Sequence, residues 1–297
     1  MPELPEVETI VRGLKKKVLN KKIKNLWTDS PKLIKKPKSF TAFKKALKGR
    51  KIEAVRRRGK NILLEVSGGK TILIHQKLTG HLLFGKWRRK KGKWISEING
   101  PLAEDPMNKF LHIIFWLDKG CQLALSDLRK LAKLELWDKK ELERSKGFLE
   151  LGPEPLSRDF SFQKFKEAIA KKKGPIKRVL MDQKVIAGIG NIYSDEILFL
   201  ARIHPLTPAN MLSAKQIKKL YQSIREILKI AIKYKGTTIL SGAEEYRLPS
   251  GERGKYQEKR QVYRKENKPC PRCGKKIKRI KIGQRSAHFC SVCQKID

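Results

Sequence analysis

The first residues of the chain combine an early proline with closely spaced carboxylates. The sequence opens MPELPEVETI, so Pro2 follows the initiator methionine and is flanked by Glu3, Glu6 and Glu8. Methionine is usually removed in front of a small residue such as proline, which would leave a secondary amine at Pro2. An α-amino group titrates roughly two to three units below a lysine, so more of it is neutral at pH 7. Pro2 is therefore either a nucleophile that can form an iminium or an accident of the start site.

Four of the five cysteines lie near the end of the chain in two CxxC pairs. They are Cys270, Cys273, Cys290 and Cys293. Each CxxC turn supplies two thiolates, and zinc accepts four of them in a tetrahedron. A redox-active pair is the alternative, but two pairs at this spacing favour one structural Zn²⁺. Cys121 lies in an apolar segment and is expected to be a buried small hydrophobic residue.

Four further segments hold residues with two possible roles. The segment RRRGK (56–60) is either a basic patch or the approach to a functional Lys60. In DLRKL (127–131), Arg129 is either an arginine paired at the rim of the core or a probe inserted into a duplex. AGIGNIYSDEI (187–197) lacks the third glycine of a dinucleotide fingerprint but suits a helix capped by Asn191. The free amides of such a helix bind phosphate, although a structural corner is the alternative. Residues 278–290 predict a hairpin with Arg285 near its tip, as a surface residue or an exposed contact.

Charge points to a polyanionic partner. The 297 residues include 70 Lys+Arg and 29 Asp+Glu, for a formal net charge of +41. Such a field attracts nucleic acid, and the basic residues run through the whole chain and form no single tail. A Lys-rich compositional bias is the alternative. No secretory signal or membrane-length apolar segment is recognised, so we expect a cytoplasmic protein with no membrane contact.

The elements that must position these residues change character along the chain. An amphipathic helix over 5–19 precedes apolar, partly alternating segments typical of an antiparallel sandwich or barrel. The expected strands are 60–66, 70–76, 109–117 and 121–128. After a Pro-rich linker at 152–160, the pattern predicts four helices: 162–171, 176–183, 192–200 and 213–234, the last capped by Ser213. Residues 236–256 are polar and Gly-rich, which predicts a mobile loop.

The chain resembles the formamidopyrimidine-DNA glycosylase family of bacterial base-excision repair. The resemblance rests on five segments in this order: PELPEVE, RRRGK, DLRKL, GIGNIYSDE and the terminal cysteine module with GQRS. The resemblance covers essentially the whole chain. It implies an α+β fold: an N-terminal β-sandwich with a flanking helix, a helix-two-turn-helix domain and a zinc-ribbon β-hairpin. The implied boundaries are 1–147, a linker at 148–160, 161–266 with a lesion loop, and 267–297.

The resemblance also implies roles for individual residues. Pro2 would be the nucleophile, Glu3 an acid/base group, Glu6 its supporting carboxylate, and Lys60 a phosphate contact that assists catalysis. The implied DNA-binding residues are His75, Leu78, Arg129, Leu131, Asn191 and Arg285. The implied activity is that of a glycosylase and abasic-site lyase, which excises 8-oxoguanine and formamidopyrimidines and cuts by β,δ-elimination. The expected partner is duplex DNA with oxidised bases or abasic sites, bound by a nucleoid-associated monomer.

The sequence departs from the family where the void left by a flipped base is filled. The family uses Met, Arg and Phe, and here the positions are Leu78, Arg129 and Leu131. Leucine is an apolar wedge without an aromatic face, and a base-stacking contact is worth about 1–3 kcal/mol. We therefore expect weaker lesion interrogation or opposite-base discrimination. Gln76 also replaces an apolar residue, and the loop at 241–256 does not match closely.

Two other functions remain open. One is an endonuclease VIII-like glycosylase for oxidised pyrimidines, which a substrate panel would distinguish. The other is a catalytically silent damaged-DNA-binding protein, which a retained Met1 would favour because a blocked amine cannot attack. Pro2, Glu3 and Lys60 argue against the silent protein.

Overall fold

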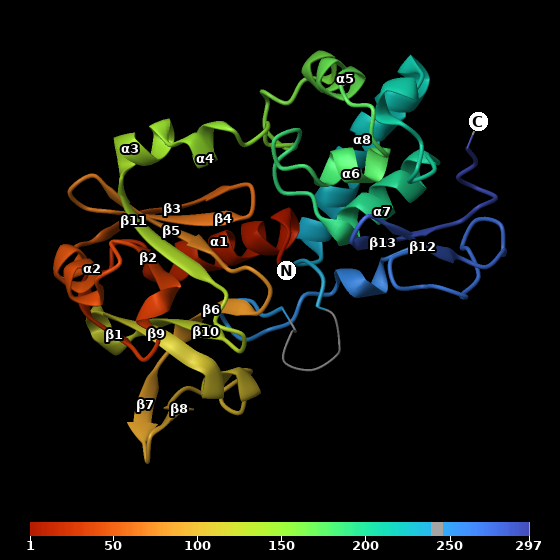
Figure 1. Ribbon diagram of the computed structural model, residues 1–297. Helices are drawn as coiled ribbons and strands as arrows, with labels where there is room; N and C mark the ends of the chain where they lie inside the picture. Colours follow the sequence, from red (N-terminus) through yellow and green to blue (C-terminus); the bar gives the residue numbers. More distant parts are fainter. Residues whose placement is uncertain (239–245, 297) are drawn as a thin grey trace. The chain divides into compact units, whose positions relative to one another are not determined.

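A computed structural model describes residues 1–238 and 246–296, which form two compact units (Figure 1). The first unit contains Met1–Leu149 and also Tyr234–Gln257. The second contains Glu150–Lys233 and the described residues from Glu258 onward. The first unit is thus built from two stretches of chain that are far apart in the sequence.

Two sheets and a helix form the core of the first unit. One sheet has the order β1 (Ile23–Thr28), β9 (Leu111–Leu117), β10 (Gln122–Asp127) and β6 (Gly80–Gly85), with all neighbours antiparallel. The other has the order β2 (Ile34–Lys36), β11 (Lys133–Asp138), β5 (Lys70–His75), β4 (Asn61–Val66) and β3 (Ile52–Arg58). Only the β2–β11 pair in these sheets is parallel among the described residues. Apolar side chains of both sheets and of helix α1 (Leu4–Val18) share one core.

The predicted sandwich with a flanking helix is therefore confirmed. Val7, Ile10, Leu14 and Val18 of α1 are buried, as the helical period predicts, and Pro5 lies in the first turn, where a missing N–H costs nothing. The helix packs against β3, β4 and β6. This packing fixes the direction in which the N-terminus of the chain leaves the core.

Smaller elements decorate the sheets. They are helices α2 (Phe40–Leu47), α3 (Lys139–Arg144) and α4 (Lys146–Leu149), strands β7 (Trp87–Lys90) and β8 (Lys93–Ser96), and short 3-10 turns at Pro31–Leu33, Pro106–Phe110 and Asp118–Gly120. The Ser39 hydroxyl caps α2 by accepting from the Ala42 N–H. Strands β7 and β8 form a separate two-stranded ribbon.

The second unit is helical with a terminal hairpin. Its elements are α5 (Phe162–Ala170), α6 (Ile176–Met181), α7 (Asn191–Ala201), a 3-10 turn at Ala209–Met211, α8 (Ala214–Lys233), β12 (Lys278–Ile282) and β13 (Arg285–Phe289). A further 3-10 turn covers Tyr256–Glu258. Helix α7 packs against α8 and against β13. The Ser213 hydroxyl accepts from the Gln216 N–H, so the predicted cap of α8 is confirmed.

The sequence predicts a mobile loop over 236–256, and part of the described segment is packed against the first unit's core. Tyr246, Leu248 and Tyr256 are buried, and Arg247 forms a buried ion pair with Asp105. Residues 239–245, which include the start of the expected lesion loop, lie outside the described residues. Gly251 and Gly254 allow this packing, because a Cβ on either would lie within 3 Å of neighbouring atoms. Across the described part of the chain, no helix combines the length and apolarity needed to cross a membrane.

Candidate functional site

The N-terminal residues form a buried polar cluster at the start of α1. Glu3 and Glu6 are 3% and 2% exposed, and Pro2 is also buried, whereas Met1 is 46% exposed. One oxygen of the Glu6 carboxylate, Oε2, accepts from the Glu3 N–H at 2.9 Å. Carboxylates in a first turn also interact favourably with the helix dipole. The cluster therefore presents two carboxylates beside the amine that methionine removal would create.

The second stretch of the first unit completes this cluster. Glu6 Oε1 accepts from the Thr237 N–H at 2.7 Å, and the Tyr246 hydroxyl donates to the Glu6 carbonyl at 3.2 Å. Gly236 has a φ of +80°, and a Cβ built on it would lie 2.8 Å from Glu6 Oε1. Only glycine fits this position. Sequence reasoning missed Gly236 and Thr237, because no local pattern links them to a residue 231 positions earlier.

An arginine connects α1 to the turn that carries Lys60. The Arg57 Nε donates to Glu8 Oε2 at 2.9 Å, and its Nη1 donates to the Gly59 carbonyl at 3.0 Å. Burial alone would raise the pKa of Glu8, but hydrogen bonds from Arg12 and Arg57 outweigh burial and lower it. Lys60 is 8% exposed and lies in the tight turn before β4, not in a strand as expected. Gly59, at φ +56°, makes this turn possible.

His75 lies at the end of β5 among cations. Burial first, and then repulsion from Lys77, Lys60 and Lys133, lower its pKa to about 4. Its Nδ1 accepts from the Lys77 N–H at 3.0 Å. A neutral imidazole that accepts at one nitrogen carries its proton on the other. His75 is therefore neutral at neutral pH and carries its proton on Nε2.

Two loops that carry predicted DNA-binding residues share one buried carboxylate. Asp127, at the end of β10, is fully buried. Its Oδ1 accepts from the Thr79 hydroxyl, and its Oδ2 accepts from the N–H groups of Leu131 and Ala132 at 2.7 Å each. The Arg129 N–H donates to Thr79 Oγ1 and Asp127 Oδ1. The β5–β6 and β10–β11 loops are thus held as one structure.

These loops leave the expected wedge residues accessible. Leu131 is 39% exposed, Arg129 is exposed and Leu78 is half-buried. The buried Gln76 Nε2 donates to the Gly80 carbonyl at 3.0 Å and closes the loop that contains Leu78. The unusual glutamine thus has a structural role. Sequence reasoning singled out DLRKL but missed Asp127 itself, although a polar residue between an apolar strand and a turn is a signal for a loop-fixing carboxylate.

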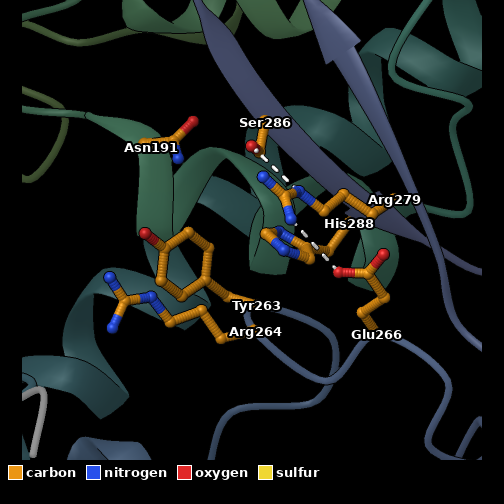
Figure 2. A pocket seen from close by; sticks show the side chains of 7 residues that line it. All are labelled: Asn191, Tyr263, Arg264, Glu266, Arg279, Ser286 and His288. Atoms are coloured by element: carbon orange, nitrogen blue, oxygen red, sulfur yellow. Dashed lines mark hydrogen bonds and ion pairs between the residues drawn. The ribbon is translucent and has the colours of Figure 1, made fainter.

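In the second unit, a hollow of about 410 Å³ opens beside the first turn of α7 (Figure 2). Its lining residues are mostly basic or polar: Asn191, Tyr263, Arg264, Glu266, Arg279, Ser286 and His288. Asn191 is the first residue of α7, and Gly190 occupies the N-cap position that was expected for Asn191. In Figure 2 the side chains of Asn191, Tyr263 and Arg264 lie along one side of the hollow. Arg279 pairs with Glu266 at 3.4 Å, and Arg264 is the other arginine of the lining.

Two buried carboxylates hold this hollow together. Glu196 accepts from the N–H groups of Gln261, Val262 and Tyr263 at 2.7 to 3.0 Å, which fixes the segment that carries Tyr263. Burial raises the pKa of Glu196, although these three bonds oppose the shift.

Asp195 performs the same task from the other side of α7. It pairs with the buried Lys177 and accepts from both the N–H and Nδ1 of His288. The SDE triplet in the α7 motif is the signal that could have revealed both carboxylates.

Arg285 begins β13 directly after the Gly283-Gln284 turn and is exposed, as predicted. Its neighbour Ser286 lines the hollow. Asn191, Arg285 and the four cysteines all belong to the second unit, whereas the other predicted site residues belong to the first.

The four predicted cysteines form one cluster that fits a zinc ion. All four sulfur atoms lie within 4.8 Å of one another. The Cys270–Cys293 and Cys273–Cys290 Sγ distances are 3.9 and 3.4 Å. A tetrahedron with Zn–S bonds of about 2.3 Å has S···S edges of about 3.8 Å. These residues hold one structural Zn²⁺, and the closed set of four thiolates leaves no open coordination position for substrate.

Models of three protein domains match the chain. A formamidopyrimidine-DNA glycosylase N-terminal domain matches residues 1–134, the H2TH domain of the same family matches 151–242, and a zinc finger found in FPG and IleRS matches 267–296. Formamidopyrimidine-DNA glycosylase of Pelotomaculum thermopropionicum is 39% identical over 296 residues, with 100% of both chains covered. The chain belongs to the formamidopyrimidine-DNA glycosylase family. It is a DNA glycosylase of base-excision repair.

Other members of the formamidopyrimidine-DNA glycosylase family agree in sequence and in structure. The protein of that name from Streptococcus thermophilus is 40% identical, with 99% of this chain and 100% of the relative covered. A crystal structure of a Lactococcus lactis FPG mutant in complex with Fapy-dG-containing DNA has a TM-score of 0.86 at 34% identity, and covers 99% and 100% of the two chains. MutM (FPG) of Thermus thermophilus has a TM-score of 0.82 at 33% identity, and covers 99% and 98%.

Proposed function

We propose that the chain excises oxidised purines from duplex DNA and then cleaves the resulting abasic site, with the amine of Pro2 as nucleophile. The observation that carries the proposal is the buried cluster of Pro2, Glu3 and Glu6, in which Glu6 is held by Thr237 from the far end of the unit. A catalytic group needs such a rigid support. The proposal requires that Met1 is removed during synthesis, which a small residue such as proline at position 2 favours.

The proposed reaction uses bonds that the cluster can make and break. The neutral Pro2 nitrogen attacks C1′ of the damaged nucleotide, and the bond from C1′ to the base breaks. The base leaves with the bonding electrons and takes up the proton that the amine nitrogen loses. Glu3 gives a proton to the ring oxygen, the deoxyribose opens, and an iminium remains on Pro2. Loss of a proton from C2′ sends electrons into this cation, and the 3′ phosphate leaves by β-elimination. Loss of the proton from C4′ then expels the 5′ phosphate by δ-elimination. A one-nucleotide gap results.

DNA contacts are proposed from the cations and donors of each unit. Lys60 and the Nε2–H of neutral His75 would hold phosphate in the first unit, and Asn191 and Arg285 would hold phosphate in the second. Leu78, Arg129 and Leu131 would fill the space that the flipped base leaves. Tyr263 and Arg264 beside Asn191 add an aromatic hydroxyl and a further cation.

Borohydride trapping tests the proposal directly. The protein is incubated with a duplex that contains 8-oxoguanine opposite cytosine, reduced, and digested for mass mapping of the cross-linked peptide. We expect the adduct on Pro2. Pro5→Ala is a matched control, because Pro5 is buried in the same first turn but carries no free amine, and it should trap as the unchanged protein does. No adduct on this duplex or on an abasic duplex would overturn the proposal.

A second substrate class is favoured by one observation. Leu131 and the half-buried Leu78 give the wedge an aliphatic surface in place of an aromatic one. A structure of the Lactococcus lactis relative contains DNA with an oxidised pyrimidine. A panel that compares 8-oxoguanine with thymine glycol decides the preference, and faster excision of thymine glycol would favour the endonuclease VIII-like alternative. We also propose that the chain acts on DNA as a monomer at the nucleoid. Its proposed domains are 1–147, 161–266 and 267–297 with a linker at 148–160, and Tyr234–Gln257 of the second domain packs with the first unit.

A further inference from the structure

The β7–β8 ribbon concentrates positive charge outside the main core of the first unit. Residues 86–93 read KWRRKKGK, and no acidic residue occurs before Glu97. The strands pair in register, with Arg88 opposite Ile95, and Lys90 opposite Lys93. Cross-strand partners point to the same face of a ribbon. One face therefore carries Arg88, Lys90 and Lys93, and Lys91 lies at the turn.

The opposite face anchors the ribbon through aromatic side chains. The Trp94 ring packs edge-on against Trp27 with 5.0 Å between centroids, and it lies 6.3 Å from Trp116. Arg89 stacks over Trp27 at 5.4 Å. At the base of the ribbon, the Trp87 indole donates to Asn108 Oδ1 at 2.8 Å. These contacts hold the basic face outward.

The charge of this face is only partly neutralised within the described residues. Glu97 pairs with Lys86 and Arg88, but no ion pair is found for Lys90, Lys91 or Lys93 in the described part of the chain. Lys90 and Lys93 are directly opposite each other, an arrangement that is destabilising in a strand pair. A polyanion would relieve this repulsion. A two-stranded ribbon also has the width that the major groove of DNA admits.

We propose that the β7–β8 ribbon is a second DNA contact, which binds the backbone of the duplex away from the lesion. The proposal rests on the proposed function for the position of the lesion. Strand β6 runs from Gly80, beside the loop of Leu78, to Gly85, where the ribbon begins. Five steps of about 3.4 Å separate the two ends, or about 17 Å. That length corresponds to about five base pairs of DNA, so the ribbon reaches only duplexes that extend well past the lesion.

The test compares affinity for two lengths of DNA. Duplexes of about 9 and 31 base pairs, each with a central tetrahydrofuran abasic analogue, are titrated by fluorescence anisotropy over a range of salt concentrations; the short duplex extends only about four base pairs on either side of the analogue. Each phosphate contact contributes a slope of about 0.9 to the plot of log affinity against log salt. The variant replaces Arg88, Lys90, Lys91 and Lys93 with serine and keeps every tryptophan. Its slope on the long duplex should fall by about 2 to 4, and its slope on the short duplex should not change.

A matched control separates a local contact from the loss of net charge. Four exposed lysines of the same unit are replaced with serine in this control: Lys32, Lys35, Lys38 and Lys45. This control should bind both duplexes as the unchanged protein does. A double variant, Lys90→Gln with Lys93→Gln, should lower the salt slope on the long duplex by about half as much. This double variant replaces the fourfold variant in the test if the fourfold variant misfolds. An unchanged long-duplex slope, an equal loss on both lengths, or an equal loss in the control would overturn the proposal. Borohydride trapping on a short duplex with 8-oxoguanine in place of the tetrahydrofuran reports the proposed function separately, because the tetrahydrofuran has no leaving group at C1′ and cannot be trapped.

Discussion

The hydroxyl of Thr79 donates a hydrogen bond to the carboxylate of Asp127, and this contact joins two loops that are 48 residues apart. The same carboxylate accepts from the N–H groups of Leu131 and Ala132. The residues expected to enter the DNA therefore sit on a shared support. A change in one loop is transmitted to the other through a buried charge.

Thr79→Val should weaken this support with almost no change in volume. Asp127 would lose its side-chain donor, and a buried group that loses a partner costs about 1–3 kcal/mol. We expect lower stability in urea unfolding, and single-turnover excision of 8-oxoguanine should slow more than cleavage of an abasic duplex. Thr79→Ser keeps the hydroxyl and should restore both properties. Equal behaviour of the valine and serine variants would contradict the role of the bond.

Gly236→Ala should displace the Glu6 carboxylate. The added Cβ would lie 2.8 Å from Glu6 Oε1, at a backbone φ of +80° that already disfavours alanine. Gly49→Ala is a suitable control, because Gly49 has a φ of +85° and no atom within 4 Å of the built Cβ. Both variants should lose the stability that a left-handed alanine costs, about 1 kcal/mol. Only Gly236→Ala should also reduce borohydride trapping, and equal trapping by the two would show that Glu6 tolerates the shift.

The sequence predicts much of this arrangement where the signal is local. The period of α1, the two CxxC pairs and the hairpin that presents Arg285 follow from short-range patterns, and the structure has them. Thr237 could not be placed beside Glu6, because that contact spans the two stretches of the first unit. The packing of Tyr246 and Leu248 was hidden in a segment whose composition resembles a loop. The sequence predicts Asn191 as the N-cap of its helix, whereas Asn191 is the first helical residue and Gly190 is the N-cap. A difference of one residue is usual at helix ends.

Leu131→Phe should restore a stacking surface at an exposed position. Leu131 is 39% exposed, so a larger ring can be accommodated without repacking the core. A base-stacking contact of about 1–3 kcal/mol should raise excision of 8-oxoguanine and sharpen the preference for cytosine over adenine opposite the lesion. Steady-state kinetics on the two duplexes measures this. An unchanged rate and preference would show that the aliphatic wedge already suffices.

The His75 imidazole should remain neutral well below neutral pH. Its pKa in the folded protein is about 4, below the ordinary value of about 6.5. As pH falls from about 6.5 to 4, the unfolded chain takes up a proton that the folded chain does not, so the histidine lowers stability over that range. NMR titration of the free protein should give a midpoint near 4. His75→Gln should flatten the fall in unfolding free energy, and a midpoint near 6.5 would contradict the buried, cation-flanked environment.

Loss of zinc should disorder the terminal module. Cys270 and Cys290 share a small core with Phe199, and Arg272 in the first CxxC turn donates to the Phe199 carbonyl at 2.6 Å. Elemental analysis should find one zinc per chain, and Cys273→Ala should lose it together with DNA affinity. Cys121→Ala removes the cysteine outside the cluster and should keep the metal. Retention of zinc by Cys273→Ala would contradict the four-thiolate site.

The division of the first unit between two stretches of chain has a consequence for synthesis. The ribosome releases both sheets long before residue 237, so a nascent chain can form the sandwich while Glu6 still lacks the Thr237 N–H. The hydrogen bond from the Thr237 N–H to Glu6 closes one of the longest loops in the protein. Such contacts form late in folding, because closing a long loop costs chain entropy before the contact stabilises the fold. The scaffold is therefore made early, and the N-terminal cluster of the chain acquires its support only when synthesis is nearly complete.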